Sequence, residues 1–196
     1  MGYREPAAMT PSATVGSGRL TERMTALVGE VRAVVDRGLP PELTAYLVGE
    51  RLAPRLRESD LLTEDQREGD PDRYRQHLVH AEPDGGFSVV ALVWLPGQHT
   101  PIHDHVAWCV AGVHEGQESE TRYRLVSDGR TAHLVETEHV VAPAGSVAAF
   151  APPGDIHVVR NTGTTIAHSI HIYGADISRL GTSVRRTYRL PADGRK

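Results

Sequence analysis

The sequence predicts a mainly β fold, a closed barrel or two-sheet sandwich, with an N-terminal α-helical extension. From residue 74 onward, many short apolar segments are bounded by turn residues such as Asp84-Gly85-Gly86 and Pro96-Gly97. Strands of this length and spacing are typical of small barrels and sandwiches. Before them, apolar residues recur at three- and four-residue steps, which is the period of a helix. A chain of 196 residues is long enough to bury a core of ordinary size.

The helical extension is expected over residues 19–72. It follows a leader, residues 1–18, which is rich in Ala, Pro, Ser, Thr and Gly and is expected to be disordered. The first helix has one apolar stripe and is followed by Gly38, as is common just past a helix C-terminus. The stripe consists of Leu20, Met24, Leu27, Val28, Val31, Val34 and Val35.

A second helix is expected to begin at Pro40-Pro41-Glu42, because proline and an acidic residue favour the first helical turn. Pro54 is expected to end or kink this helix. The predicted buried face consists of Leu43, Tyr46, Leu47 and Leu52. The charged, turn-rich residues 57–72 are expected to form a connection or a short helix.

The barrel is expected over residues 73–190, followed by a loose tail at 191–196. Within the barrel, strands are predicted wherever apolar and β-branched residues lie between turn signals. The predicted strands are 74–80, 87–95, 105–113, 119–126, 131–138, 146–151, 156–161 and 166–173.

Composition is that of a soluble globular protein, with 39% hydrophobic residues, 23% charged residues and a net charge of -4. This balance gives no electrostatic reason to expect nucleic acid or a membrane as partner. The first residues lack the apolar region of a signal peptide, and the apolar runs are too short to span a bilayer. The single cysteine, Cys109, excludes an intrachain disulfide, which suits a reducing compartment. We therefore expect a cytoplasmic protein.

The candidate site is centred on His103 and His105, which are separated by one residue. On a strand, residues i and i+2 project from the same face, so the two imidazoles can converge on one transition-metal ion. A polar strand face can also carry two histidines without a metal. A third histidine, His157, lies in Pro152-Pro-Gly-Asp-Ile-His157-Val-Val-Arg-Asn161 and adds weight to the metal interpretation.

These two stretches resemble the paired motifs of the cupin superfamily. Gly97, His103, His105 and Gly116 match the spacing of G-x5-H-x-H-x3-E-x6-G. Residues 152–161 match P-x-G-x2-H-x3-N at its proline, glycine, histidine and asparagine. The resemblance covers about residues 74–175 and implies a cupin double-stranded β-barrel, jelly-roll-like, with a metal at its open end.

One departure from the cupin pattern concerns the glutamate of the first motif, a metal ligand in many cupins, which is replaced by Cys109. Three neutral imidazoles, His103, His105 and His157, would then hold the ion. An ion with such ligands keeps its charge and open positions, which favour an incoming thiolate. Zinc with a water as fourth ligand fits three histidines equally well.

Ser169, His171 and Tyr173 alternate along one predicted strand and so share one face. They can form a relay from hydroxyl to imidazole to phenol, although an ordinary polar barrel interior would show the same pattern. The set resembles the cysteine dioxygenase family of thiol dioxygenases, whose Ser-x-His-x-Tyr strand implies a catalytic role for these three residues. Counted back from Gly116, Cys109 falls where animal members have a cysteine cross-linked to this tyrosine, which implies a Cys109–Tyr173 cross-link, although the loop after His105 is one residue shorter here. A small buried hydrophobic residue is the alternative for Cys109.

The same resemblance implies a substrate site at Tyr74 and Gln76. Where the family's Tyr-x-Arg binds the carboxylate of cysteine, this chain has Gln76, as in bacterial relatives that resemble 3-mercaptopropionate dioxygenases. Glutamine cannot offer a charged, bidentate fork to a carboxylate, and Arg75 would point to the opposite face. Another cation is therefore expected near the substrate. The candidates are Arg160, Arg179, Arg185 and Arg186.

The predicted function is oxidation of a small carboxylated thiol by O2 to a sulfinic acid, with Fe(II) as cofactor and 3-mercaptopropionate as the favoured substrate. One alternative is an L-cysteine dioxygenase that forms cysteine sulfinate. Others are a cupin enzyme that uses zinc, nickel or manganese, and a non-enzymatic metal or ligand sensor. Either a monomer or a homodimer is compatible with the sequence.

Overall fold

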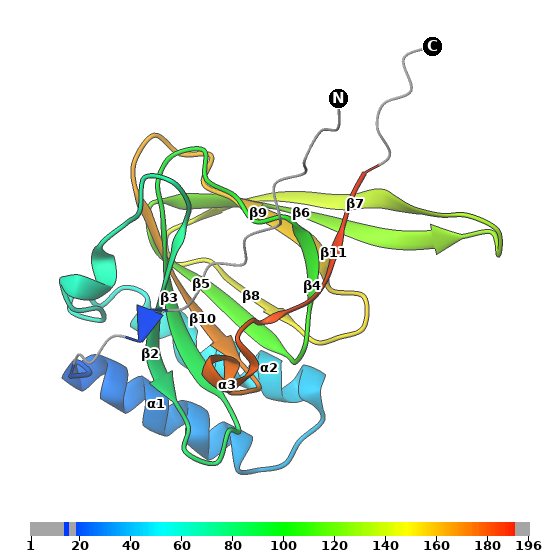
Figure 1. The fold of residues 1–196 in the computed structure, drawn as a ribbon. Coiled ribbons are helices and arrows are strands. Elements are labelled where there is room, and N and C mark those ends of the chain that lie inside the picture. The colour runs from blue at the N-terminus through cyan, green and yellow to red at the C-terminus, as the bar shows by residue number, and fades with distance from the viewer. Residues whose placement is uncertain (1–13, 16–18, 191–196) are drawn as a thin grey trace.

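The computed structural model describes residues 14–15 and 19–190, whose elements form three layers (Figure 1). Two helices cover one face of a six-stranded sheet, and a five-stranded sheet faces its other side. The predicted mainly β fold with N-terminal helices is confirmed. The predicted tail and all of the leader except residues 14–15 lie outside the described residues.

Helix α1 (Glu22–Val35) begins at a capped N-terminus, where the Thr21 hydroxyl accepts the N–H of Met24 at 3.0 Å. Gly38 follows the helix with a φ of 60°, a conformation that glycine adopts readily. The buried side chains are those of the predicted stripe. They are Met24, Leu27, Val28, Val31 and Val34.

Helix α2 (Pro41–Arg55) starts at the predicted proline and has Pro54 in its last turn. Its predicted buried face is wrong at Leu43 and Tyr46, which are 44% and 58% exposed. A face of mostly smaller residues packs on the sheet instead, because it allows closer approach: a Cβ on Gly49 would lie 3.4 Å from a methyl of Val147. This face consists of Thr44, Ala45, Val48, Gly49 and Leu52. The connection that follows contains one short 3-10 helix, η1 (Asp65–Arg67).

The two sheets have the strand orders β1-β2-β3-β10-β5-β8 and β11-β4-β9-β6-β7. Neighbouring strands are antiparallel except β1 and β2, which are parallel. The strands are β1 (Thr14–Val15), β2 (Arg75–Ala81), β3 (Ser88–Trp94), β4 (Ile102–His105), β5 (Cys109–Glu115), β6 (Gln117–Ser127), β7 (Ala132–Pro143), β8 (Val147–Phe150), β9 (Ile156–Arg160), β10 (Ala167–Tyr173) and β11 (Val184–Tyr188).

The predicted strand 105–113 is wrong as a single element. The chain leaves the five-stranded sheet after β4, crosses between the layers at residues 106–108 and enters the six-stranded sheet as β5. Strand β11 and the short helix α3 (Ile177–Leu180) were not predicted. Strand β11 is an edge strand of mostly polar residues, so it lacks the apolar pattern by which strands are recognised in a sequence.

The central strands of the six-stranded sheet are buried on both faces. Every residue of β3 and β10 is buried, because one face packs on the helices and the other faces the second sheet. This explains why β3 has a continuous apolar sequence. On the inner face, β10 directs polar side chains into the space between the sheets, and these side chains form part of the site described below.

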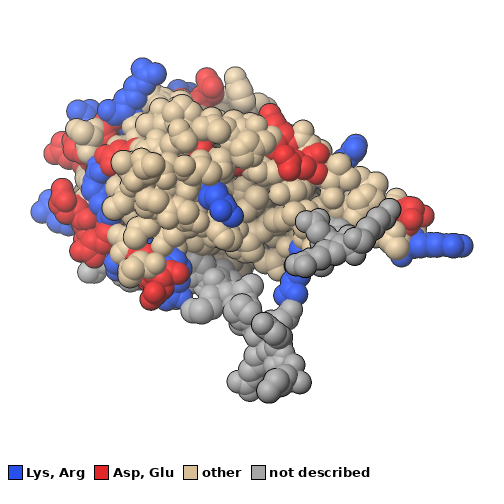
Figure 2. Space-filling model, turned by 90° about the horizontal axis from the view of Figure 1, so that it is seen from above, with Lys and Arg blue, Asp and Glu red and all other residues tan. Residues whose placement is uncertain are grey.

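The outer surface carries both signs of charge. On the face shown in Figure 2, acidic and basic side chains intermix around a broad area that is mostly uncharged but contains a basic side chain, and that face has no continuous basic patch. No helix among residues 14–15 and 19–190 is long and apolar enough to cross a membrane.

Candidate metal centre

Strands β4 and β9 bring the three motif histidines together between the sheets. His103 and His157 are register partners, and His105 projects from the same face of β4 as His103. All three are buried, and one ring nitrogen from each lies within 4.8 Å of the others. The predicted ligand set therefore converges on one point, and these residues could hold a metal ion.

Each imidazole is oriented by an acceptor at Nδ1. His103 donates to the carbonyl of Pro101 at 3.0 Å, His105 to the Asp155 carboxylate at 3.0 Å, and His157 to the Glu120 carboxylate at 2.7 Å. Carbonyl and carboxylate oxygens only accept, so the proton resides on Nδ1 and the lone pair on Nε2. This arrangement is typical of histidines that bind metals.

The electrostatics of the cluster fit a divalent cation. Burial lowers the pKa of His103 well below its usual value, and the nearby His157 and His105 add to the effect. Burial also lowers the pKa of His105, although Asp155 opposes the shift. Both rings are therefore neutral at neutral pH, as metal binding requires. The Nε2 atom of His157 is buried without a hydrogen-bond partner among the described residues, a vacancy that a metal would fill.

Asp104, between the two β4 histidines, points away from the cluster and holds β4 to β11. Its Oδ2 accepts from Arg185 at 2.8 Å, from Arg186 at 2.6 and 3.0 Å, and from the Tyr188 hydroxyl at 2.9 Å. Burial would raise the Asp104 pKa, but these hydrogen bonds outweigh it and hold the pKa well below its usual value. Strand β4, which carries His103 and His105, is therefore held in place by β11 on the side opposite the histidines.

Strand β10 supplies the predicted relay. The Tyr173 hydroxyl lies 3.2 Å from Nδ1 of His171, and Nε2 of His171 lies 3.1 Å from the Ser169 hydroxyl, which accepts from the Trp94 indole at 3.0 Å. Burial lowers the pKa of His171 to about 3 and raises that of Tyr173 well above its usual range. At neutral pH the imidazole is therefore neutral and the phenol keeps its proton.

The predicted substrate residues line the same enclosed space. Tyr74 and Gln76 face a cavity of about 20 Å³ together with the three histidines, His171 and Tyr173. The Tyr74 ring stacks on Trp94 with centroids 4.5 Å apart, and burial raises the pKa of Tyr74 to about 12, partly offset by Gln76. Arg75 points elsewhere and bonds Glu68 at 3.3 Å, as strand alternation predicts.

The expected cation is missing from this cavity. Among the described residues that line it, there is no arginine or lysine. Arg185 and Arg186 bind Asp104, Arg179 pairs with Asp176 at 3.2 Å, and Arg160 is exposed. Neutral side chains surround the histidines instead, so the expectation that one of these arginines faces the substrate is not met.

Cys109 lies opposite Tyr173 in the pairing of β5 and β10, and both belong to one buried cluster. Burial raises the pKa of the Cys109 thiol well above its usual value, so the thiol keeps its proton. The cross-link between these residues stays a prediction. Trp108 belongs to the core between the sheet and the helices and does not line the cavity.

Sequence reasoning missed several residues at the centre. Asp155 orients His105, and Glu120 orients His157. Ser183 lines the cavity and hydrogen-bonds Tyr173. This hydrogen bond lowers the pKa of Tyr173, whereas burial raises it. Asp155 could have been noticed because it lies two residues before His157 in the second motif, but it accepts a hydrogen bond from His105 and not from His157. Glu120 and Ser183 stand in stretches with no recognisable motif.

A family model described as cysteine dioxygenase type I matches residues 65–182, more than half of the chain, and supports the cupin barrel predicted from the two motifs. An RmlC-like cupin protein from Desulfovibrio desulfuricans is 26% identical over 60% of this chain and 96% of its own, with a TM-score of 0.42. A cupin 2 conserved barrel domain protein from Salinispora arenicola is 22% identical over 57% of this chain and 83% of its own, with a TM-score of 0.40.

Proposed function

Because the chain belongs to the cysteine dioxygenase type I family, we propose that it is an Fe(II)-dependent dioxygenase that oxidises a small carboxylated thiol, preferentially 3-mercaptopropionate, to its sulfinic acid. One thiol, R–SH, and one O2 give one R–SO2H. Both oxygen atoms become bonded to sulfur, and the thiol hydrogen ends on a sulfinic oxygen. Sulfur supplies all the electrons, so no further reductant takes part.

One observation supports this function most strongly. The three motif histidines line the same cavity as His171 and Tyr173 of the hydrogen-bonded chain on β10. Fe(II), when held through Nε2 of His103, His105 and His157, supplies the redox chemistry that dioxygen requires and leaves positions for the substrate. The three ligands are neutral, so the full charge of the ion acts on the substrate and favours its thiolate form.

The chain's own residues then position the reactants. Tyr173 offers a protonated phenol at the edge of the cavity, and His171 fixes its orientation at 3.2 Å. Ser169 holds His171 from the far side, and Trp94 anchors the Ser169 oxygen. A phenol held in this way can donate a hydrogen bond to the substrate or to dioxygen with little loss of conformational freedom.

Substrate selection is assigned to Gln76 and Tyr74. The cavity of about 20 Å³ has room for about one water-sized group, so even a small thiol can enter only if the surrounding side chains move. With no arginine or lysine in its described lining, the carboxylate would be bound by the Gln76 amide and the Tyr74 hydroxyl. Both thiols carry this carboxylate, so the preference for 3-mercaptopropionate is based on Gln76, which bacterial relatives that resemble 3-mercaptopropionate dioxygenases have at this position.

The test is oxygen consumption by the iron-loaded protein with 3-mercaptopropionate and with L-cysteine, with sulfinate products identified by mass spectrometry. We expect uptake with both and a strong preference for 3-mercaptopropionate. Preference for L-cysteine would contradict the role given to Gln76. Absence of uptake with either thiol would contradict the dioxygenase proposal for these substrates.

Metal dependence separates this function from the other cupin activities. Chelation should abolish oxygen uptake, and Fe(II) should restore it while Zn²⁺, Ni²⁺ and Mn²⁺ should not. Restoration of oxygen uptake by Zn²⁺ would contradict the redox role given to the metal, because zinc has no redox activity.

A further inference from the structure

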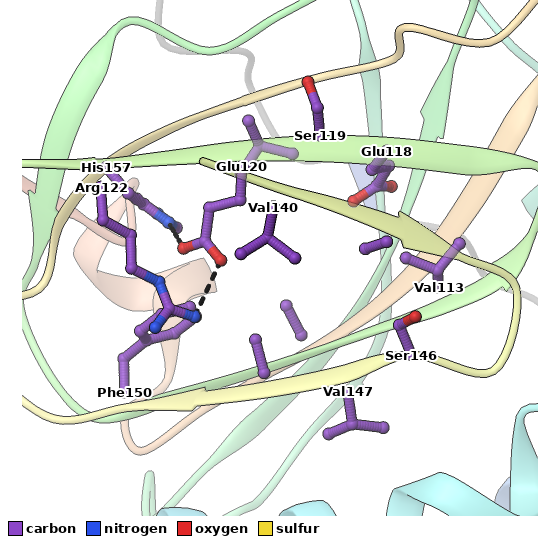
Figure 3. Close-up of a pocket in the computed structure, with 14 residues that line it drawn as sticks. Val113, Glu118, Ser119, Glu120, Arg122, Val140, Ser146, Val147, Phe150 and His157 are labelled. Carbon is purple, nitrogen blue, oxygen red and sulfur yellow. Dashed lines mark hydrogen bonds and ion pairs between the residues drawn. The ribbon is translucent and has the colours of Figure 1, made fainter. Parts of the chain in front are cut away.

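A second, larger cavity lies between the sheets on the other side of His157. It has a volume of about 340 Å³ and is walled by β5 and β8 on one side and by β6, β7 and β9 on the other (Figure 3). Of its lining, only His157 and Val159 also line the cavity of the metal centre. The volume falls within the range of small-molecule sites, whereas the metal-centre cavity is far smaller.

Glu118 gives this cavity an unsatisfied polar group. It is only 5% exposed, and its carboxyl points from β6 into the space between the sheets (Figure 3). The Ser169 side chain hydrogen-bonds the Glu118 carboxyl, but Oε1 of Glu118 has no hydrogen-bond partner among the described residues. A buried carboxyl oxygen without a donor is costly, so the site favours a ligand that brings one.

The other charged groups of the lining are already paired. Glu120 accepts from His157 at 2.7 Å and from Arg122 at 3.0 Å. Arg122, the one arginine or lysine in the described lining, also pairs with Glu138 at 3.0 Å. Glu118 is therefore the carboxyl that remains for an incoming partner, and the surrounding charges leave a negative balance that favours a cation.

Apart from Ser119, Ser146 and His157, the rest of the wall is apolar. Small aliphatic side chains and one aromatic ring surround the space below Glu118, so a ligand needs an apolar body to fill it. The principal apolar residues are Val113, Val140, Ala142, Val147, Ala148 and Phe150.

We propose that this cavity binds a small molecule that combines an apolar body with a primary ammonium group, and that the ammonium lies against Glu118. A positive group beside a buried carboxylate forms a charge-assisted hydrogen bond, which is the strong kind. Burial raises the pKa of Glu118 to about 7; the nearby charge of Glu120 adds to this shift, and the hydrogen bond from Ser169 opposes it. Above neutral pH the Glu118 carboxyl is therefore mostly ionised and can pair with an ammonium group.

The test is calorimetric titration of the full chain, above neutral pH, with cyclohexylammonium and with cyclohexanol, which has nearly the same shape and no charge. We expect saturable binding of cyclohexylammonium and binding of cyclohexanol that is weaker by roughly tenfold or more. Glu118→Gln should weaken cyclohexylammonium binding by a similar factor. Glu136→Gln, which removes an exposed carboxylate from β7, should not.

A second variant keeps the test independent of how Glu118→Gln folds. Ala148→Phe fills the cavity from β8 without changing any charge and should abolish binding. The proposal is wrong if wild type binds no cyclohexylammonium, if cyclohexanol binds as tightly, or if either cavity variant binds as wild type does. Because neither thiol nor oxygen enters the measurement, its outcome is independent of the proposed dioxygenase activity.

Discussion

Asp155 is expected to set the metal affinity of the centre through His105. Its Oδ2 accepts both the backbone N–H and the Nδ1–H of His105, each at 3.0 Å, and its side chain is only 2% exposed. Asp155→Asn keeps the shape and an oxygen acceptor but removes the charge. Asp155→Ala removes both hydrogen bonds and leaves the imidazole free to rotate.

The magnitude follows from these contacts. Loss of a group that orients a metal-binding histidine typically lowers metal affinity by about 10- to 100-fold, or about 1.4 to 2.8 kcal/mol. Asp155→Asn should fall near the lower end of this range, because the amide oxygen can still accept from the ring and the backbone. Asp155→Ala should fall near the upper end, because nothing then fixes the proton on Nδ1.

The assay is competition for Co²⁺ or Zn²⁺ between each protein and a chromophoric chelator of known affinity. Glu136→Gln serves as the matched control, because it removes an exposed carboxylate that contacts none of the ligands. Wild-type affinity in both Asp155 variants would refute the reasoning. It would show either that His105 is not a ligand or that strand β4 alone holds its ring in place.

Other expected outcomes concern catalysis and stability. Tyr173→Phe should lower turnover by roughly 100-fold while metal content stays unchanged, as measured by oxygen uptake and metal analysis; full activity would remove the phenol from the mechanism. Gln76→Arg should raise the ratio of kcat/KM for L-cysteine to that for 3-mercaptopropionate by roughly tenfold, since it restores the arginine of the family's Tyr-x-Arg cysteine site; an unchanged ratio would show that residue 76 does not select between the two thiols. Asp104→Asn should destabilise the fold to urea at neutral pH. The pKa of Asp104 is lower in the folded state than in the unfolded state. Its contribution to the free energy of unfolding is therefore fully present above the unfolded pKa of about 4 and is lost as pH falls through the folded pKa. The difference in stability between wild type and variant should shrink in acid.

The metal centre could be predicted because its residues alternate on short strands. The spacing of His103 and His105, and of Ser169, His171 and Tyr173, reflects the two-residue period of a strand, which survives in the sequence whatever the tertiary structure. The backbone conformation of the motif residue Gly116, with a φ of 75°, is a local requirement of the same kind.

The rest depends on which strands become neighbours, and local patterns do not specify this. Glu120 meets His157 only because β6 pairs with β9, and Asp155 meets His105 across the same sheet. The burial of Glu118 likewise comes from the facing sheet, since on sequence alone Glu118 and Glu120 are charged residues of an ordinary strand. The face of α2 was wrong for a related reason, because closeness to the sheet favoured Gly49 and Ala45 over Leu43 and Tyr46.

The positions of the carboxylates explain how this centre can leave room for an anionic substrate. Cys109 stands where many cupins have a ligating glutamate, and its buried thiol faces Tyr173 in the strand pairing. The negative charges are instead placed behind the ligands, with Asp155 at Nδ1 of His105 and Glu120 at Nδ1 of His157. There they strengthen the imidazoles as donors without occupying a coordination position. Cys109→Glu should therefore add a ligand, and the variant should bind metal more tightly while losing oxygen uptake with the thiol.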